Sequence, residues 1–177
     1  MRISGGQWRS RQLISPQGRD IRPTAQIVKE GLFNMLQGRL HGARMLDIFA
    51  GTGQMGLEAL SRGAAQAVFI DRNLNALTAN ASLIGVTPEC IKGDFKYALR
   101  ELEAKGRRFD IIFADPPYEA GFYPEIMLMA GALMNKDSVL ALEHDSRENI
   151  LPLGGLKIIK QRKYGRRAIT LLALLED

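Results

Sequence analysis

Cysteine and histidine are almost absent from this sequence. The 177 residues include one cysteine, Cys90, and two histidines, His41 and His144. A lone cysteine cannot form an internal disulfide, and these three residues do not have the spacing of a zinc-binding motif. We therefore expect a protein without a metal site that works in a reducing compartment.

Long hydrophobic runs are also missing. No apolar stretch approaches the ~20 residues that a membrane-spanning helix needs. The first eleven residues are polar and basic, unlike the apolar centre of a secretory signal. Hydrophobic residues still make up 46% of the chain and charged residues 24%, which is the balance of a globular protein. We therefore expect residues 1–177 to form a single cytoplasmic domain, with a basic extension at 1–22 and a core at 23–177.

Acidic residues are scarce in two segments of the chain, one at the N-terminus and one shortly before the C-terminus. Residues 1–22 contain five arginines and one acid, and residues 157–167 contain six basic residues and no acid, whereas the rest of the chain is net acidic. If the two segments meet in space, they would form a surface that neutralises phosphates, and otherwise each is a solvated face. The candidate substrate-binding residues are Arg9, Arg11, Arg22, Thr24, Arg166 and Arg167.

Short apolar runs alternate with helical patterns through most of the chain, which predicts an α/β fold with a mostly parallel sheet. The expected strands are 45–49, 67–70, 89–92, 109–114 and 138–143, and the expected helices between them are 55–62, 73–84, 95–105 and 122–134. Two short strands in 1–15 and an amphipathic helix of about four turns, with apolar residues from Ile27 to Leu40, precede them. The segments 156–163 and 168–175 are separated by only four residues, so they should pair as an antiparallel hairpin at the sheet edge.

A glycine-rich turn follows the first strand. Gly51, Gly53 and Gly56 have the spacing G-x-G-x-x-G, which lets a backbone approach a ligand closely. Asp71 comes twenty residues after Gly51, where an acid could accept hydrogen bonds from ribose hydroxyls. This much fits a nicotinamide dehydrogenase equally well.

Two further acids favour a different cofactor. Asp47 lies inside the apolar first strand, where it could orient the glycine turn and a ligand ammonium but would repel a pyrophosphate. Asp94 ends the third strand and could accept a hydrogen bond from an adenine amine, with Phe95 packing on the ring. For Asp71 and Asp94 the simpler alternative is a helix N-cap. The set suits S-adenosylmethionine, and the candidate cofactor-binding residues are Asp47, Ala50, Gly51, Thr52, Gly53, Asp71, Arg72, Asp94 and Phe95.

The fourth strand ends in Asp115, Pro116, Pro117 and Tyr118, which are the candidate catalytic residues. Two prolines make a rigid loop whose carbonyls can face an open site. Asp115 and the Pro116 carbonyl could accept hydrogen bonds from an exocyclic amine and direct its lone pair at a methyl donor, with Tyr118 stacked on a flipped base. The alternative is an ordinary proline-rich turn. Trp8 could likewise stack on a base or cover the edge of the core.

Motifs along nearly the whole chain resemble the bacterial small-subunit rRNA guanine-N2 methyltransferase family. They are R-I-S-G-G-Q-W-R from Arg2, R-P-T from Arg22, K-E-G-L-F-N from Lys29, L-D-I-F-A-G-T-G from Leu46, G-L-E-A-L-S-R-G from Gly56, D-P-P-Y from Asp115 and K-Y-G from Lys163. The chain departs from the family pattern at Asp71, where the family tends to have Glu, at Ser10, and at the basic pair Arg166 and Arg167.

The resemblance implies a Rossmann-like class I methyltransferase fold with a seven-stranded sheet, S-adenosylmethionine as cofactor, and methylation of a guanine N2 amine in 16S rRNA, of the guanine-966 type. The expected partner is ribosomal RNA, free or in a small subunit or its assembly intermediate, and the protein is expected to act as a monomer. Two alternatives remain open. An N6-adenine DNA methyltransferase shares D-P-P-Y, although this chain has little room for a target-recognition domain, and a nicotinamide-binding oxidoreductase shares the glycine spacing.

Overall fold

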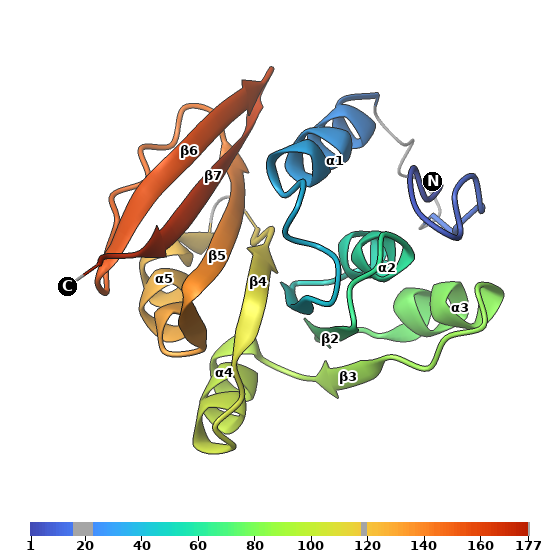
Figure 1. The fold of residues 1–177 in the computed structure, drawn as a ribbon, viewed down its shortest axis with the longest axis horizontal. Coiled ribbons are helices and arrows are strands. Elements are labelled where there is room, and N and C mark those ends of the chain that lie inside the picture. The colour runs from blue at the N-terminus through green and yellow to red at the C-terminus, as the bar shows by residue number, and fades with distance from the viewer. Residues whose placement is uncertain (16–22, 118–119, 177) are drawn as a thin grey trace.

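A computed structural model describes residues 1–15, 23–117 and 120–176 of the chain, with the side chains of 23–25 left out (Figure 1). Its centre is a seven-stranded sheet of order β3-β2-β1-β4-β5-β7-β6. The first five strands are parallel, and β7 is antiparallel to both of its neighbours. The strands are β1 Arg44–Ile48, β2 Gln66–Asp71, β3 Glu89–Lys92, β4 Phe109–Ala114, β5 Met134–Asp145, β6 Leu156–Tyr164 and β7 Arg167–Leu174. This confirms the predicted Rossmann-like α/β fold with its C-terminal hairpin.

Five helices cover the two faces of the sheet. They are α1 Pro23–Met35, α2 Gln54–Ser61, α3 Asn75–Leu83, α4 Phe95–Ala104 and α5 Tyr123–Gly131. Apolar residues of α1, α2 and α3 pack with one face of the sheet, and those of α4 and α5 pack with the other. The two groups of helices lie on opposite sides of the sheet in Figure 1.

Successive side chains of each central strand point to opposite faces of the sheet. In β4, Ile111 and Phe113 pack under α1 to α3, whereas Ile112 and Ala114 pack under α4 and α5. A parallel strand covered on both faces has to be apolar throughout, which explains the continuous hydrophobic run seen in the sequence. The same alternation determines which face each residue beyond the strand end will occupy.

Some boundaries differ from the predicted ones. The predicted N-terminal strands are reduced to one isolated bridge, Arg2 with Gln12, because this segment has no neighbouring strand to extend a ladder. Helix α1 ends at Met35, and Ile27, predicted to face the core, is 54% exposed. Strand β5 begins earlier than predicted because Met134 pairs with Phe109 beside an irregularity in the ladder.

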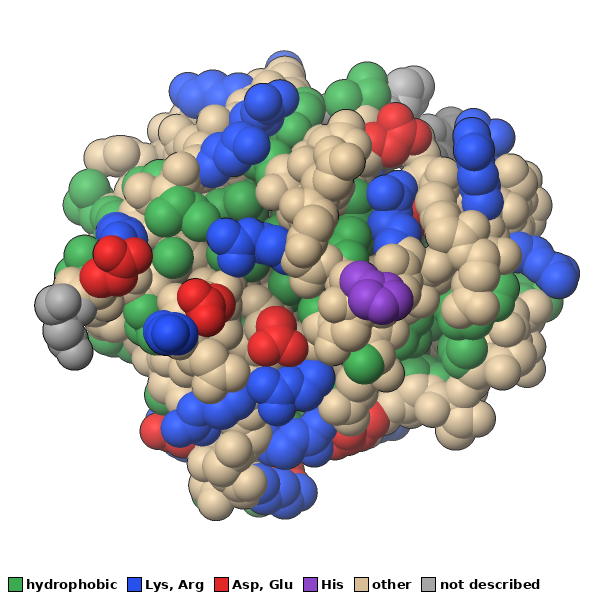
Figure 2. All heavy atoms as spheres, in the orientation of Figure 1, with side chains coloured by type: hydrophobic (Ala, Val, Ile, Leu, Met, Phe, Trp, Pro, Cys, Tyr) green, Lys and Arg blue, Asp and Glu red, His purple; other side chains and the backbone are tan. Residues whose placement is uncertain are grey.

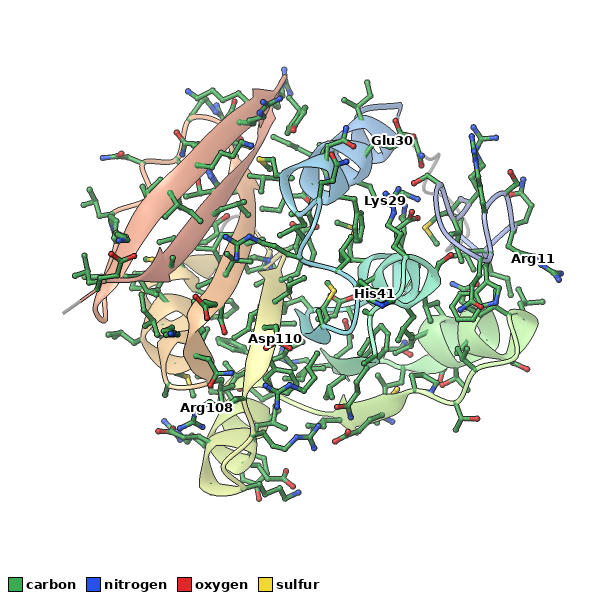
Figure 3. All side chains as sticks on the ribbon, in the orientation of Figure 1. Arg11, Lys29, Glu30, His41, Arg108 and Asp110 are labelled. Atoms are coloured by element: carbon green, nitrogen blue, oxygen red, sulfur yellow. The ribbon has the colours of Figure 1, made fainter. Side chains whose placement is uncertain are left out.

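A buried ion pair holds the N-terminal segment onto the helices. Lys29 Nζ lies 3.1 Å from Glu58 Oε2, and both side chains are almost completely buried. Lys29 also donates to the Arg2 carbonyl at 2.5 Å, and the Ser4 N–H donates to Glu58 Oε2 at 2.8 Å. In Figure 3 the Lys29 side chain extends from α1 toward α2. The ion pair therefore joins residues 2–4 to both helices.

Candidate functional site

The glycine turn between β1 and α2 adopts a conformation that needs glycine. Gly51 and Gly53 have φ values of 54° and 75°, in the left-handed region. A Cβ on Gly53 would lie 2.1 Å from Leu77 Cδ1, so this glycine also allows α2 and α3 to approach. A Cβ on Gly51 would meet only the Phe49 carbonyl, at 4.0 Å. The Gly51 backbone therefore borders open space that a ligand can enter.

Asp47, inside β1, is hydrogen-bonded to the backbone that follows this turn. The Gly56 N–H donates to Asp47 Oδ2 at 2.9 Å, at the start of α2. Burial raises the pKa of Asp47 to about 7, and the nearby Asp71 carboxylate adds to the shift. The expectation that Asp47 orients the glycine turn agrees with this contact, whereas a contact with a ligand ammonium stays a prediction.

Asp71 lies directly against the turn at the end of β2. Its Oδ2 accepts the Gly51 N–H at 2.7 Å, and its Oδ1 accepts the Asn73 N–H at 2.9 Å. Helix α3 begins only at Asn75, and its N-cap residue Leu74 makes no side-chain cap bond. The helix N-cap alternative for Asp71 is therefore wrong, and the ribose contact stays a prediction.

Asp94 does cap a helix. Its side chain accepts the Lys96 N–H at 3.0 Å at the start of α4, as the simpler alternative expected. It also pairs with Arg72, whose Nη2 donates to Asp94 Oδ2 at 2.7 Å, and this hydrogen bond holds the pKa of Asp94 below its ordinary value. Arg72, which follows β2, thus contacts the acid that follows β3. We therefore expect a bound cofactor to contact the two side chains together.

Three phenylalanines form an aromatic cluster beside Asp94. The ring centroid of Phe95 lies 4.9 Å from that of Phe49 and 5.2 Å from that of Phe122. Phe95 is only 3% exposed, whereas Phe49 and Phe122 are half-buried. The accessible ring surface therefore belongs to Phe49 and Phe122, which were not among the predicted site residues. Phe49 has a φ of 64°, which is strained for a non-glycine residue. Phe122 directly precedes α5, far along the chain from Phe49.

Asn80 was also missed. It is completely buried in α3, and its Nδ2 donates to the Thr52 carbonyl at 3.0 Å in the glycine turn. Its Oδ1 accepts the Ile14 N–H at 2.6 Å. A single amide therefore connects the N-terminal segment to the turn. The available signal was a polar residue on the buried side of an apolar helix.

Asp115 lies one residue beyond β4, on the same sheet face as Asp47. Ala114 pairs with Leu142 in the parallel ladder, so the next residues along, Asp115 and Glu143, are neighbours. Burial raises the pKa of Asp115 to about 8, the Glu143 and Asp47 carboxylates act in the same direction, and Arg167 opposes them. Asp115, Pro116 and Pro117 thus continue from β4 beside the glycine turn. Tyr118 lies outside the described residues.

Glu143 and Arg167 form a second charged pair at this edge. The Arg167 Nη1 donates to Glu143 Oε1, and the Glu143 side chain is 5% exposed. Arg167, predicted as a contact to the substrate, therefore has a buried carboxylate as partner. Glu143 was not predicted, because in sequence it looks like the polar end of an apolar strand.

Comparison with known proteins gives the family. The model of a family described as Conserved hypothetical protein 95 matches residues 1–173. The ribosomal RNA small subunit methyltransferase D of Escherichia coli (strain K12) is 38% identical over 164 residues, which cover 86% of this chain and 78% of that protein. This chain belongs to that family. The solved structure of the Escherichia coli protein yhhF is similar with a TM-score of 0.85 at 29% identity, covering 100% of this chain and 99% of that one. The solved structure of a protein from Thermus thermophilus gives a TM-score of 0.84 at 28% identity, covering 98% of this chain and 99% of that one.

In this family member, the basic residues predicted to bind substrate lie in two separate places. Helix α1 lies between the described part of the N-terminal segment and the β6–β7 hairpin (Figure 1), and the turn end of the hairpin is next to this helix, where Tyr164 is close to Gly31. Arg11 points away from the rest of the molecule (Figure 3). Arg9 and Arg11 are exposed, as is Arg166. That the two basic segments form one RNA-binding surface stays a prediction, and Figure 2 shows the Lys and Arg side chains of this face in several groups. Arg22 and the Thr24 side chain lie outside the described residues.

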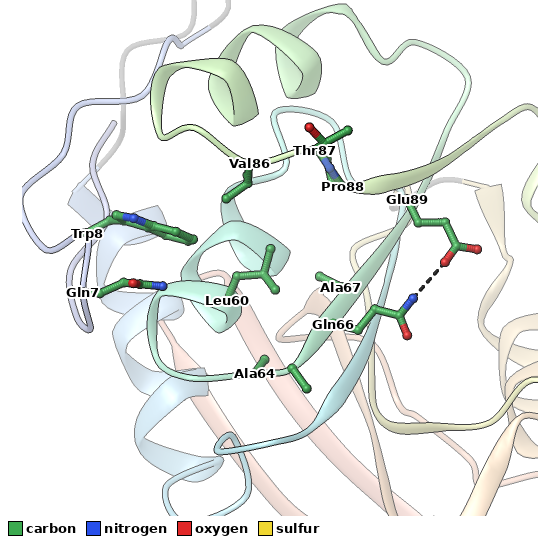
Figure 4. A pocket seen from close by; sticks show the side chains of 11 residues that line it. Gln7, Trp8, Leu60, Ala64, Gln66, Ala67, Val86, Thr87, Pro88 and Glu89 are labelled. Atoms are coloured by element: carbon green, nitrogen blue, oxygen red, sulfur yellow. Dashed lines mark hydrogen bonds between the residues drawn. The ribbon is translucent and has the colours of Figure 1, made fainter.

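A cavity of about 340 Å³ lies elsewhere in the molecule, between Trp8 and the region where β2 and β3 begin (Figure 4). Gln66 and Glu89, the first residues of these strands, line it. It therefore lies at the amino ends of the parallel strands, opposite the carboxyl ends where Asp71 and Asp115 lie. Trp8 is half-buried and packs against the core, which agrees with its covering role.

Within residues 1–15, 23–117 and 120–176, no group of three or more His, Cys, Asp or Glu residues could hold a metal ion. Over the same part of the chain, no helix has both the length and the apolar character of a membrane span.

Proposed function

We propose that this protein transfers a methyl group from S-adenosylmethionine to the exocyclic N2 amine of a guanine in small-subunit rRNA. The observation that carries the proposal is the position of Asp115, Pro116 and Pro117 at the end of β4, beside the turn of Gly51 and Asp71. Membership of a family of rRNA methyltransferases supports the RNA substrate. We further propose that the chain acts as a monomeric single domain in the cytoplasm, on free rRNA or on an assembly intermediate.

The described residues fit S-adenosylmethionine, the cofactor of the family. The space beside Gly51 is open, and the Asp71 carboxylate next to it is partly exposed and keeps lone pairs beyond its two backbone contacts. The Gly51 turn and Asp71 would hold the ribose and the amino-acid part, and Asp94 with the rings of Phe49 and Phe122 would hold the adenine. When bound, this cofactor supplies an electrophilic methyl group on its sulfonium.

Asp115 and the Pro116 carbonyl would act on the acceptor amine. An amine conjugated to a purine ring is a poor nucleophile because its lone pair is delocalised. Hydrogen bonds from both amine protons to fixed oxygens favour a pyramidal nitrogen and aim its lone pair out of the ring plane. Two consecutive prolines keep the loop rigid, so little ordering is needed when the base enters. The proton lost after transfer can pass to Asp115.

Alternative activities are less compatible with the site. A nicotinamide cofactor would bring its pyrophosphate to the Gly51 turn, close to the carboxylates of Asp47 and Asp71. A DNA adenine methyltransferase would share the loop of Asp115, but the Escherichia coli (strain K12) relative named above is an rRNA methyltransferase.

The choice of cofactor can be measured directly. We expect titration calorimetry to detect binding of S-adenosylmethionine or its demethylated product and none of NAD, because Asp71 and Asp94 near the strand ends, with Asp47 below the glycine turn, suit a cationic ligand. Binding of NAD without binding of S-adenosylmethionine would contradict the proposal.

The reaction is tested with labelled cofactor and rRNA, free or in 30S particles from a strain that lacks the modification. Nucleoside analysis should find the label in N2-methylguanosine. N6-methyladenosine would overturn the base assignment, and label on protein alone would overturn the RNA substrate.

The basic hairpin turn offers a separate test of RNA binding. Arg166→Ala should weaken RNA binding and lower the slope of log affinity against log salt by about one unit, because one phosphate contact is lost. Cofactor affinity should not change. Arg100→Ala, which removes an exposed arginine from α4, is the matched control and should leave the slope unaltered. Equal slopes for wild type and the Arg166 variant would remove this turn from the RNA surface.

A further inference from the structure

The pair of Glu143 and Arg167 has no role in the methyl transfer described so far. A buried carboxylate is costly to desolvate, and its pairing with arginine at best offsets that cost. Such pairs are therefore weak evidence for stability. Their position at the reaction site suggests a chemical purpose.

The sheet register places the pair beside Asp115. Glu143 and Asp115 are neighbours across the β4–β5 ladder, and Glu143 and Arg167 occupy the same face of the β5–β7 ladder, two residues apart in register. The effects of the Glu143 and Arg167 charges on the pKa of Asp115 agree with this proximity. Side chains from three adjacent strands therefore present, in spatial order, a carboxyl group, a carboxylate and a guanidinium.

This order of groups matches one nucleobase edge. The Watson–Crick edge of guanine carries the N2 amine and the N1–H as donors, followed by O6 as an acceptor. Adenine has an amine donor followed by N1 as an acceptor, so a carboxylate facing its N1 would be repelled. Arginine commonly donates to guanine O6, and carboxylates accept from base N–H groups.

Resting on the proposed function, we propose that Glu143 and Arg167 select guanine: Glu143 accepts the N1–H and Arg167 donates to O6, while Asp115 engages the N2 amine. Arg167 is 32% exposed, so its guanidinium can contact Glu143 and a bound base together. A flipped base is read in this way through its Watson–Crick edge.

The test uses 2-aminopurine, which keeps the reacting 2-amine but has an acceptor at N1 and no O6. We would place it in the rRNA at the position that wild-type protein methylates. Wild type should prefer guanine over 2-aminopurine by at least about 10²-fold in kcat/KM, because a site built for a donor rejects an analogue without it. In Glu143→Gln the amide can donate to N1 of 2-aminopurine, so activity on guanine should fall while activity on 2-aminopurine is kept or rises.

The preference ratio is the decisive quantity, because it does not depend on the fraction of a preparation that is folded. Asp110→Asn is the matched control, since Asp110 also pairs with an arginine, Arg44, but at the start of β4 (Figure 3). It should keep the wild-type ratio. An unchanged ratio in Glu143→Gln, or a folded variant that binds cofactor and methylates neither RNA, would overturn the selection role. Wild-type protein that fails to methylate the guanine RNA would instead overturn the proposed function.

Discussion

Replacement of Asp115 by alanine should lower the methylation rate by about 10²–10³, the usual loss when a preorganised transition-state hydrogen bond is removed. S-adenosylmethionine affinity should stay within about an order of magnitude, because Asp115 acts on the acceptor amine. Single-turnover methylation and calorimetry measure the two effects separately. Asp110→Asn, on the same strand, should keep the wild-type rate. A fully active Asp115→Ala protein would remove Asp115 from the mechanism.

The raised pKa of Asp115 adds a pH dependence to this prediction. The pKa is about 8, so in the free enzyme the carboxyl group is largely protonated at neutral pH. The carboxylate is the stronger hydrogen-bond acceptor, so kcat/KM for the RNA should rise as pH increases toward 8. Asp110→Asn should give the same profile. A profile that is flat between pH 6 and 9 would contradict the assignment.

The second large effect concerns stability. Lys29→Ala should lower the free energy of unfolding by about 3 kcal/mol or more, because it leaves the carboxylate of Glu58 buried without its lysine. Burial tends to raise the pKa of Glu58, but the Ser4 N–H, Lys29 and Arg62 outweigh it and keep the pKa below its ordinary value. The fully buried carboxylate is therefore charged and depends on these partners.

Urea denaturation measures this loss of stability. In the Lys29→Ala protein, amide hydrogen exchange should become faster than in wild type, and more so in residues 1–13 than in the sheet. Lys105→Ala removes an exposed lysine that pairs with Glu101 and is the matched control. Its effect should stay within about 1 kcal/mol, as for other surface ion pairs. A Lys29→Ala protein as stable as this control would contradict the prediction and show that Ser4 and Arg62 compensate Glu58 without the lysine.

Much of the sheet could be predicted because a parallel strand covered on both faces must be apolar. The pattern located all five parallel strands and both strands of the C-terminal hairpin. Predictions failed where a boundary depends on a neighbour. Residues 1–15 lack a partner strand, and Met134 extends β5 only because Phe109 lies beside it.

The site was only partly predictable. Asp71 and Asp115 could be located because each directly follows an apolar strand, and strand ends share one edge of a parallel sheet. Asn80, Phe122 and Glu143 could not, because each lies far along the chain from the residues it assists. Arg9 and Arg11 looked equivalent to Arg166 in sequence, yet helix α1 lies between the two segments that carry them.

By itself, the sequence determined the alternation of strands and helices, the glycines that permit left-handed backbone at 51 and 53, and the acids at the strand ends. These features follow from local conformation and from periodic burial, and both depend on residues that are close together in the sequence. Only the tertiary structure decided which distant side chains meet: Asn80 with the glycine turn, Glu58 with Lys29, and Glu143 with Arg167 beside Asp115. Such contacts depend on strand order and register, which are set by the packing of the whole core.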